Sequence, residues 1–252
     1  MKREYGLLGR QPAIRPVGLR MLSAYAPLPP APPTFNHVRS FDNWQMLGNG
    51  PDPTLTVHGG QPVGDCGFAG AVHLEMATAA ETNDSVTWPD SDDVVSAYLA
   101  YNNGADRGVA LANLLACWRS SGLFGRKISA YAPVPVHDLS ELWAACNIFG
   151  ALYIGIAVPA VAQQQFAQGL PWDLTHTSRD YDIVGGHCVV ITARTETGGT
   201  VVTWGQEQPF TNEWLSTYLE EAWAVITPEQ IEADGNGFGL DMVQLRADLD
   251  RL

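Results

Sequence analysis

Residues 60–82 read "GQPVGDCGFAGAVHLEMATAAET", a glycine-rich turn that runs directly into a long helix-like segment. The pattern predicts a helix over residues 65–81, with Asp65 as its N-cap and Cys66 in its first turn. Two interpretations of Cys66 follow. Free cysteine is among the most buried residue types, so the side chain can simply fill the core. Alternatively, the free N–H groups and the dipole of the helix start lower the pKa of the thiol and make it a nucleophile.

A nucleophilic cysteine needs a base, and the chain offers six histidines: His37, His58, His73, His137, His176 and His187. His73 lies seven residues along the same predicted helix, about 10 Å up its axis, so we do not expect it to reach the thiol. His187 opens the apolar strand "GGHCVVITAR" (185–194), where two glycines leave room for its ring. An isolated Gly-Gly-His is more often structural, but its combination with "GDCGFA" favours a Cys66–His187 pair.

A third polar group normally holds the imidazole of such a pair in place. The segment "TVVTWG" (200–205) follows the histidine strand through "TETGG", which predicts a hairpin. Thr203 lies 16 residues after His187, near the position that such a group would occupy. Gln206 or Glu207 would serve instead if the register differs. Trp204 is expected to shield the pair from water.

Acyl transfer also requires hydrogen-bond donors for the developing oxyanion. The backbone N–H of Cys66 is one such donor. The side-chain amide of Gln61 is a candidate for the second, although a solvated turn residue is an equally good interpretation of Gln61. The residues expected to line the substrate cleft are Gly64, Asp65, Gly186 and Trp204.

These motifs together resemble a papain-like cysteine peptidase; in chain order they are Gln61, Gly64-Asp65-Cys66-Gly67, Gly185-Gly186-His187 and Thr203-Trp204-Gly205. The resemblance implies that Cys66 is the nucleophile, His187 the general base and acid, and Gln61 the oxyanion donor. It implies an α+β fold of two lobes, in which a helical N-terminal lobe carries the nucleophile and an antiparallel sheet or barrel forms the C-terminal lobe. The implied activity is cleavage of peptide or isopeptide bonds through an acyl-thioenzyme, without a cofactor or a metal.

The chain departs from the family pattern at three positions. Gln61 lies five residues before Cys66 rather than six, and Val63 replaces the second cysteine of the family. When the chain is aligned on Trp-Gly, Val202 takes the place of the orienting Asn. Either Thr203 therefore serves with a shifted register, or no orienting residue exists, which would lower activity by orders of magnitude without abolishing it.

The whole chain also resembles a narrower group, the papain-like proteins encoded by actinobacterial phages and their hosts. The shared segments are "NWQMLGNG" (43–50), "GDC", "GGH", "TWxxE" and "EEAW", together with a proline-bearing arm. This likeness implies a phage-encoded viral protein that is located in the host cytoplasm or associated with the virion.

Two alternatives to a peptidase of this kind remain open. The lost Asn and the apolar, basic arm also fit a catalytically weakened papain-like scaffold that acts as a virion, assembly or partner-binding protein, since one scaffold hosts many functions. "DCGF" also resembles the pattern "DCSGF" of NlpC/P60 peptidoglycan endopeptidases. The 121 residues between Cys66 and His187 count against that assignment, because the cysteine and histidine of that family lie much closer in sequence.

Composition limits the partners. Residues 1–20 carry a net charge of +4 and the remaining residues a net charge of −17, so the body of the chain is strongly acidic. Phosphate-backbone binding needs clustered Lys and Arg, so we expect no nucleic acid. No 18-residue apolar run is present, so we expect no membrane segment, and the N-terminus lacks the features of a secretion signal. The expected substrate is a peptide or protein.

The predicted organisation is an extended arm over residues 1–38 and a papain-like domain over residues 39–252, with a helical lobe at about 60–125 and a β-rich lobe at about 126–252. The arm contains "APLPPAPPTF" (26–35), which favours an extended conformation, and is expected to lie on the acidic body or on a virion or other protein partner. Further helices are expected at 89–103, 106–122, 138–150, near 160–169, 211–222 and 239–252. Strands are expected at 126–134, 151–159, 185–194, 200–205 and 223–228.

Overall fold

A computed structural model describes residues 9–37, 63–82, 87–175, 182–234 and 238–252. Its helices are α1 (Cys66–Thr82), α2 (Ser91–Tyr101), α3 (Leu111–Ser120), α4 (Leu139–Phe149), α5 (Ala160–Ala167), α6 (Asn212–Tyr218), α7 (Pro228–Asp234) and α8 (Met242–Leu249), with a 3-10 turn η1 (Leu22–Ala24). Its strands are β1 (Phe35–Asn36), β2 (Ala130–Val134), β3 (Leu152–Pro159), β4 (Ile183–Arg194), β5 (Gly198–Thr203), β6 (Gln206–Thr211) and β7 (Leu219–Ile226). The fold is therefore α+β, as the sequence predicts.

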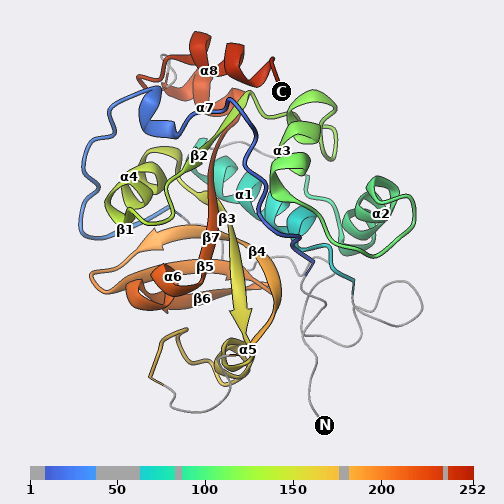
Figure 1. The fold of residues 1–252 in the computed structure, drawn as a ribbon, viewed down its shortest axis with the longest axis vertical. Coiled ribbons are helices and arrows are strands. Elements are labelled where there is room, and N and C mark those ends of the chain that lie inside the picture. The colour runs from blue at the N-terminus through green and yellow to red at the C-terminus, as the bar shows by residue number, and fades with distance from the viewer. Residues whose placement is uncertain (1–8, 38–62, 83–86, 176–181, 235–237) are drawn as a thin grey trace.

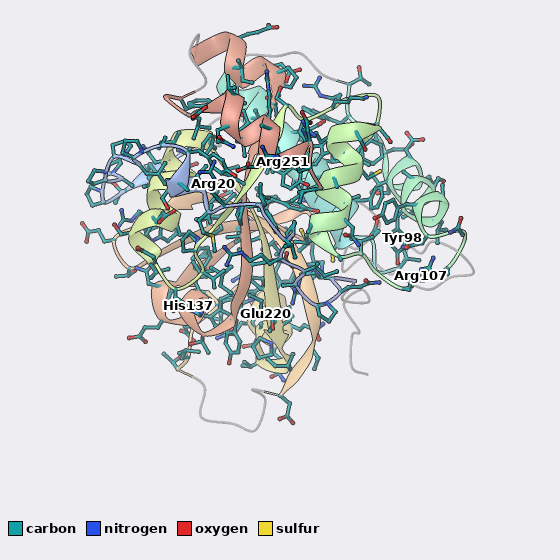
Figure 2. All side chains as sticks on the ribbon, turned by 45° about the horizontal axis from the view of Figure 1, so that its top comes forward. Arg20, Tyr98, Arg107, His137, Glu220 and Arg251 are labelled. Atoms are coloured by element: carbon teal, nitrogen blue, oxygen red, sulfur yellow. The ribbon has the colours of Figure 1, made fainter. Side chains whose placement is uncertain are left out.

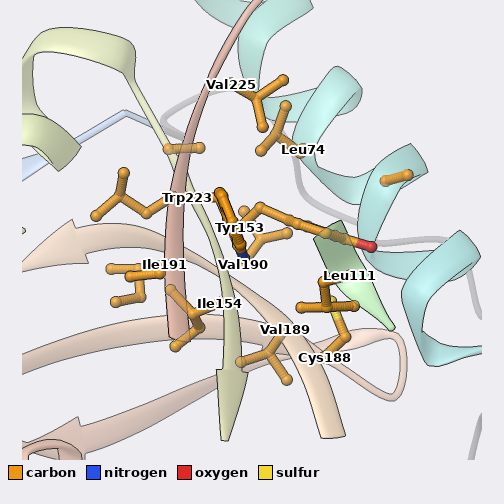
Figure 3. Close-up of a cluster of buried hydrophobic side chains, with 14 of the residues drawn as sticks. Leu74, Leu111, Tyr153, Ile154, Cys188, Val189, Val190, Ile191, Trp223 and Val225 are labelled. Atoms are coloured by element: carbon orange, nitrogen blue, oxygen red, sulfur yellow. The ribbon is translucent and has the colours of Figure 1, made fainter. Parts of the chain in front are cut away.

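The strands form one antiparallel sheet in the order β2-β7-β3-β4-β5-β6, and the short β1 pairs with β4. Helices α1, α2 and α3 form a helical part beside this sheet (Figure 1). Helix α1 packs on β4 and β3, and the Tyr153 hydroxyl donates a hydrogen bond to the Gly67 carbonyl at 2.5 Å. Figure 3 shows Tyr153 reaching from β3 toward α1, among buried residues of both parts. The helical part and the sheet are thus joined through a continuous apolar core that fixes the start of α1 against β4.

The segment after β6 differs from the sequence-based expectation. A helix was expected over 211–222, but α6 ends at Tyr218 and β7 begins at Leu219. Strand β7 lies between β2 and β3 in the sheet, and its central position supplies hydrogen bonds on both sides. Tertiary pairing therefore overrides the helical preference of "LEEA", as it does wherever a segment is placed inside a sheet. The consequence is functional, because

The described part of the arm, residues 9–37, lies along the body of the chain (Figure 1). Arg20 Nε and the Tyr25 hydroxyl each donate to the Asp248 carboxylate at 2.9 Å, which ties the arm to α8. Further along, β1 pairs with the end of β4, and Arg194 donates to the carbonyl of Pro32 at 2.9 Å. Within residues 9–37, η1 and β1 are the only regular helix or strand elements.

Candidate active site

Cys66 is the first residue of α1, and only 1% of its surface is exposed. The carbonyl of Asp65 accepts hydrogen bonds from the N–H groups of Phe68 and Ala69, which opens the helix at this position. The Cys66 thiol accepts a hydrogen bond from the backbone N–H of Cys188 on β4, with an N···S distance of 3.4 Å. The nucleophile candidate therefore lies at a helix start that faces the strand carrying His187.

Asp65 does not cap the helix in the way its sequence position predicts. Its residue is fully buried, and neither carboxylate oxygen has a hydrogen-bond partner among the described residues. Burial raises the pKa of this carboxyl well above its usual range, and the nearby charge of Asp106 adds to the effect. The side chain is consequently a neutral acid below Cys66 rather than an N-cap anion.

His187 is held by the residue that the sequence proposes as its partner. The Nε2 atom of His187 lies 2.8 Å from Thr203 Oγ1, and the ring stacks on Trp204 with centroids 5.0 Å apart and an interplanar angle of 18°. The other ring nitrogen, Nδ1, is buried without a hydrogen-bond partner. Val202 pairs with Val190 inside the sheet and is apolar, so Thr203, one residue later, occupies the orienting position. Of the two registers left open by the sequence, the structure has the shifted one.

A single small cavity brings the candidate residues together. Its lining comes from α1, β4 and the end of β5: Cys66, Ala69, Gly70, His73, His187, Cys188, Val202, Thr203, Trp204 and Gly205. The prediction that His73 lies out of reach was wrong. Residues seven apart on a helix return to the same face, so His73 lies on the same side of α1 as Cys66 and reaches the cavity. Cys188, expected in the core away from the site, also contributes to the lining.

The arm crosses this site, which the sequence did not predict. The N–H of Arg10 donates to the Gly186 carbonyl at 3.0 Å, beside His187. On the other side, Val109 donates to the Gly9 carbonyl at 2.8 Å and accepts from the N–H of Gln11 at 2.9 Å. Residues 9–11 thus form a short strand between the helical part and β4, and they cover Cys66.

Glycine is required where the arm passes the start of α1. An added Cβ on Gly9 would lie 1.7 Å from the carbonyl oxygen of Gly64, and one on Gly108 would lie 1.9 Å from the carbonyl oxygen of Gly9. Both contacts are to backbone atoms, which cannot rotate away. Gly64 and Gly186, predicted to line the substrate cleft, therefore flank the arm instead of an open cleft.

Covering the site keeps both catalytic candidates neutral. Burial raises the pKa of the Cys66 thiol to about 12, although hydrogen bonding from the backbone of Gly9 and the charge of Arg10 act in the opposite direction. Burial also lowers the pKa of His187 to about 3. The expectation of a lowered thiol pKa at the helix start is not met with the arm in place, because loss of water around the thiol outweighs the helix dipole.

The lowered pKa of His187 predicts a loss of stability in acid. In the unfolded chain this histidine binds a proton below about pH 6.5, whereas in the folded chain it does so only near pH 3. Between these values the unfolded state holds the extra proton, so the free energy of unfolding falls as the pH drops. Each pH unit of this window corresponds to about 1.4 kcal/mol. Urea unfolding at pH 7, 6, 5 and 4 measures the loss, and a His187→Gln variant should lose this component; parallel curves for the two proteins would contradict the assignment.

The hydrogen bond to Thr203 makes a second prediction about stability. Thr203→Val keeps the shape of the side chain but leaves Nε2 of the buried His187 without its partner. We expect the free energy of unfolding in urea to fall by about 1–3 kcal/mol, the usual cost of an unsatisfied buried polar group. Thr203→Ser retains the hydroxyl and is the matched control. A valine variant as stable as the serine variant would show that the contact is not a stabilising hydrogen bond.

Some predicted site residues lie outside the described part of the chain. Gln61, the expected oxyanion donor, is among them, as are arm residues 1–8 and 38 and the segment 43–50. Within the described ranges, no group of His, Cys, Asp and Glu side chains could hold a metal ion. No helix in those ranges is long and apolar enough to span a bilayer.

The helix-borne cysteine facing a histidine strand of an antiparallel sheet defines the papain-like two-lobe fold, and comparison with solved structures bears this out. The chain is similar to xylellain, a cysteine protease from Xylella fastidiosa, with a TM-score of 0.64 and 13% identity over 90% of this chain and 98% of that chain. It is also similar to digestive procathepsin L 3 of the Tenebrio molitor larval midgut, with a TM-score of 0.52 and 13% identity over 89% of this chain and 76% of that chain. No protein-family model matches the sequence, and no curated protein matches it.

Proposed function

We propose that this protein is a papain-like thiol hydrolase that cleaves peptide or isopeptide bonds with Cys66 as nucleophile and His187 as base and acid. The observation that carries the proposal is the arrangement of the His187 ring. Its Nε2 is bound to Thr203, its Nδ1 is left without a partner, and the ring lines the same cavity as the Cys66 thiol. A nucleophile, a base and a group that orients the base are the three parts such chemistry needs.

The proposed reaction begins when Nδ1 of His187 takes the proton of the Cys66 thiol. The sulfur attacks the substrate carbonyl, and the negative charge moves to the carbonyl oxygen of a tetrahedral intermediate. The backbone N–H of Cys66, at the start of α1, and the amide of Gln61 are the proposed donors to that oxygen. His187 returns its proton to the leaving amine as the C–N bond breaks, which leaves a thioester. Water, deprotonated by His187, then attacks the thioester and releases the acid and the free thiol.

The arm must leave the site before a substrate can reach Cys66. Residues 9–11 hold the backbone positions beside Gly186 and Val109 that an extended peptide would otherwise use. Entry of water and a substrate would also relieve the burial that raises the thiol pKa. The described conformation is therefore a latent one.

An arm-displaced variant tests the proposed function. We expect Gly9→Ala to hydrolyse fluorescently labelled casein measurably faster than the natural chain, because the added Cβ collides with the Gly64 carbonyl. The double variant Gly9→Ala/Cys66→Ala is the matched control and should be inactive. Equal hydrolysis by the two variants, or none by either over pH 5–9, would contradict the proposal.

A second candidate function is a non-catalytic, phage-encoded papain-like protein that binds a virion or other partner through residues 1–38, in the host cytoplasm or on the virion. Two observations favour it. Cys66 is buried under the arm with a strongly raised pKa, and the arm exposes the apolar side chains of Ile14 and Val17, the latter 95% exposed. The experiment above separates the two candidates, because a scaffold stays inactive when its arm is displaced.

A further inference from the structure

The side chain of Arg10 enters a buried acidic pocket beside the candidate active site. Only 3% of this side chain is exposed, and its NH1 group donates to Glu221 Oε1 at 2.9 Å. Its NH2 group pairs with the carboxylate of Glu220, which lies at the outer end of the pocket with 45% of its side chain exposed. Figure 2 labels Glu220 over the central strands of the sheet.

The pocket is built into the sheet. Gly155 on β3 and Gly186 on β4 provide its space, because an added Cβ on Gly155 would lie 2.5 Å from Arg10 Cδ and one on Gly186 would lie 3.1 Å from Arg10 Nε. The second oxygen of Glu221 accepts a hydrogen bond from Trp223 Nε1 at 2.9 Å, which fixes the carboxylate with Oε1 toward the guanidinium. Glu221 itself is 6% exposed.

The position of the pocket relates it to the reaction rather than to the arm alone. The backbone of Arg10 hydrogen-bonds to Gly186, the residue before His187, while the preceding Gly9 lies over Cys66. A peptide strand bound between Val109 and Gly186 in place of the arm would therefore direct a side chain into the same pocket. A buried carboxylate without a cation is unfavourable, so this pocket discriminates strongly against a neutral occupant.

We propose that Glu221, with Glu220 at the outer end of the pocket, forms a subsite that selects a guanidinium side chain in the peptide substrate. The arm residue Arg10 occupies this subsite in the latent state and is displaced by the substrate. This inference rests on the proposed function for its meaning, but its test measures binding and does not require hydrolysis. The narrow passage at Gly64 and Gly108 further requires a glycine beside the basic residue.

The probe is a blocked synthetic peptide that copies residues 7–14, "LLGRQPAI", and a second peptide with citrulline in place of the arginine. Citrulline has nearly the same shape as arginine and carries no charge. The protein is the full chain with Gly9→Ala and Arg10→Ala, which empties both the passage and the pocket. The readout is protection of Cys66 from iodoacetamide as peptide is added, located by mass spectrometry. Circular dichroism confirms that each variant is folded.

We expect the arginine peptide to protect Cys66 at a concentration at least about 10-fold lower than the citrulline peptide, the smallest effect anticipated for losing one partner of a buried charge pair. Adding Glu221→Gln to the variant should remove the difference between the two peptides, whereas Glu207→Gln, a charge change elsewhere in the β-rich part, should preserve it. Equal protection by both peptides, or no protection by either, would overturn the proposal. Selective protection without any peptide hydrolysis would support the subsite and count against the proposed hydrolase.

Discussion

His187→Ala, placed in the Gly9→Ala background, is expected to lower kcat for peptide hydrolysis by about a thousandfold, within the range that general acid–base catalysis contributes. The ring is the only proposed carrier of the proton that leaves Cys66 and later reaches the leaving amine, so both half-reactions depend on it. KM should change much less, because the imidazole is not proposed to bind the substrate. Steady-state kinetics with a labelled peptide measure both quantities.

His73→Ala in the same background is the matched control for this prediction. His73 lines the same cavity and is also buried, but it lies on α1 rather than opposite the thiol on β4. We expect its removal to lower kcat by less than about 10-fold, as for a neighbour that only adjusts the electrostatics of the base. A larger loss for His73→Ala than for His187→Ala would assign the base to the wrong histidine.

Gly9→Ala should accelerate iodoacetamide modification of Cys66 at pH 7 by at least about a hundredfold. The native thiol has its pKa raised to about 12 by burial. Return of the pKa toward the ordinary value of about 8.5 raises the thiolate fraction about a thousandfold or more, of which lower intrinsic nucleophilicity removes a part. Ejection of the arm also removes the steric cover. The modification rate of each cysteine is followed by peptide mass spectrometry.

Cys117 and Cys146 provide internal references for that experiment. Cys117 is half-buried on α3 and Cys146 is buried in α4, and neither lines the site. Their rates should stay the same in the natural chain and in Gly9→Ala. A general rise at all three positions would mean that the variant has lost its fold, and an unchanged rate at Cys66 alone would mean that the arm does not restrict access to it. Ile14→Ala, in the exposed part of the arm, should change none of the rates.

The local parts of the site could be predicted from the sequence. A glycine turn before a helix predicts where Cys66 lies, and the hairpin spacing places Thr203 beside His187. These features depend on short-range backbone geometry, which a single sequence shows directly. The position of His73 was also available in principle, since a seven-residue spacing on a helix returns to one face.

The long-range parts of the site could not be predicted. The contact between Arg10 and Glu221 joins residues 211 positions apart, and it depends on where the arm lies and on "LEEA" being a strand. Neither follows from local propensity, because the central place of β7 in the sheet determines its conformation. For the same reason the thiol pKa was expected to fall: the helix start is visible in the sequence, whereas the burial that dominates it comes from residues 9–11.

The central claim is that Cys66 forms a thioester with its substrate, and intact-mass spectrometry tests it most directly. The Gly9→Ala variant is mixed with a methyl ester of a glycyl-arginine peptide, quenched in acid within seconds and mapped by proteolysis. We predict an added mass of one acyl group on Cys66 that hydroxylamine removes, with no adduct in Gly9→Ala/Cys66→Ala. A variant whose Cys66 reacts readily with iodoacetamide but gains no acyl group at any pH from 5 to 9 would contradict the claim.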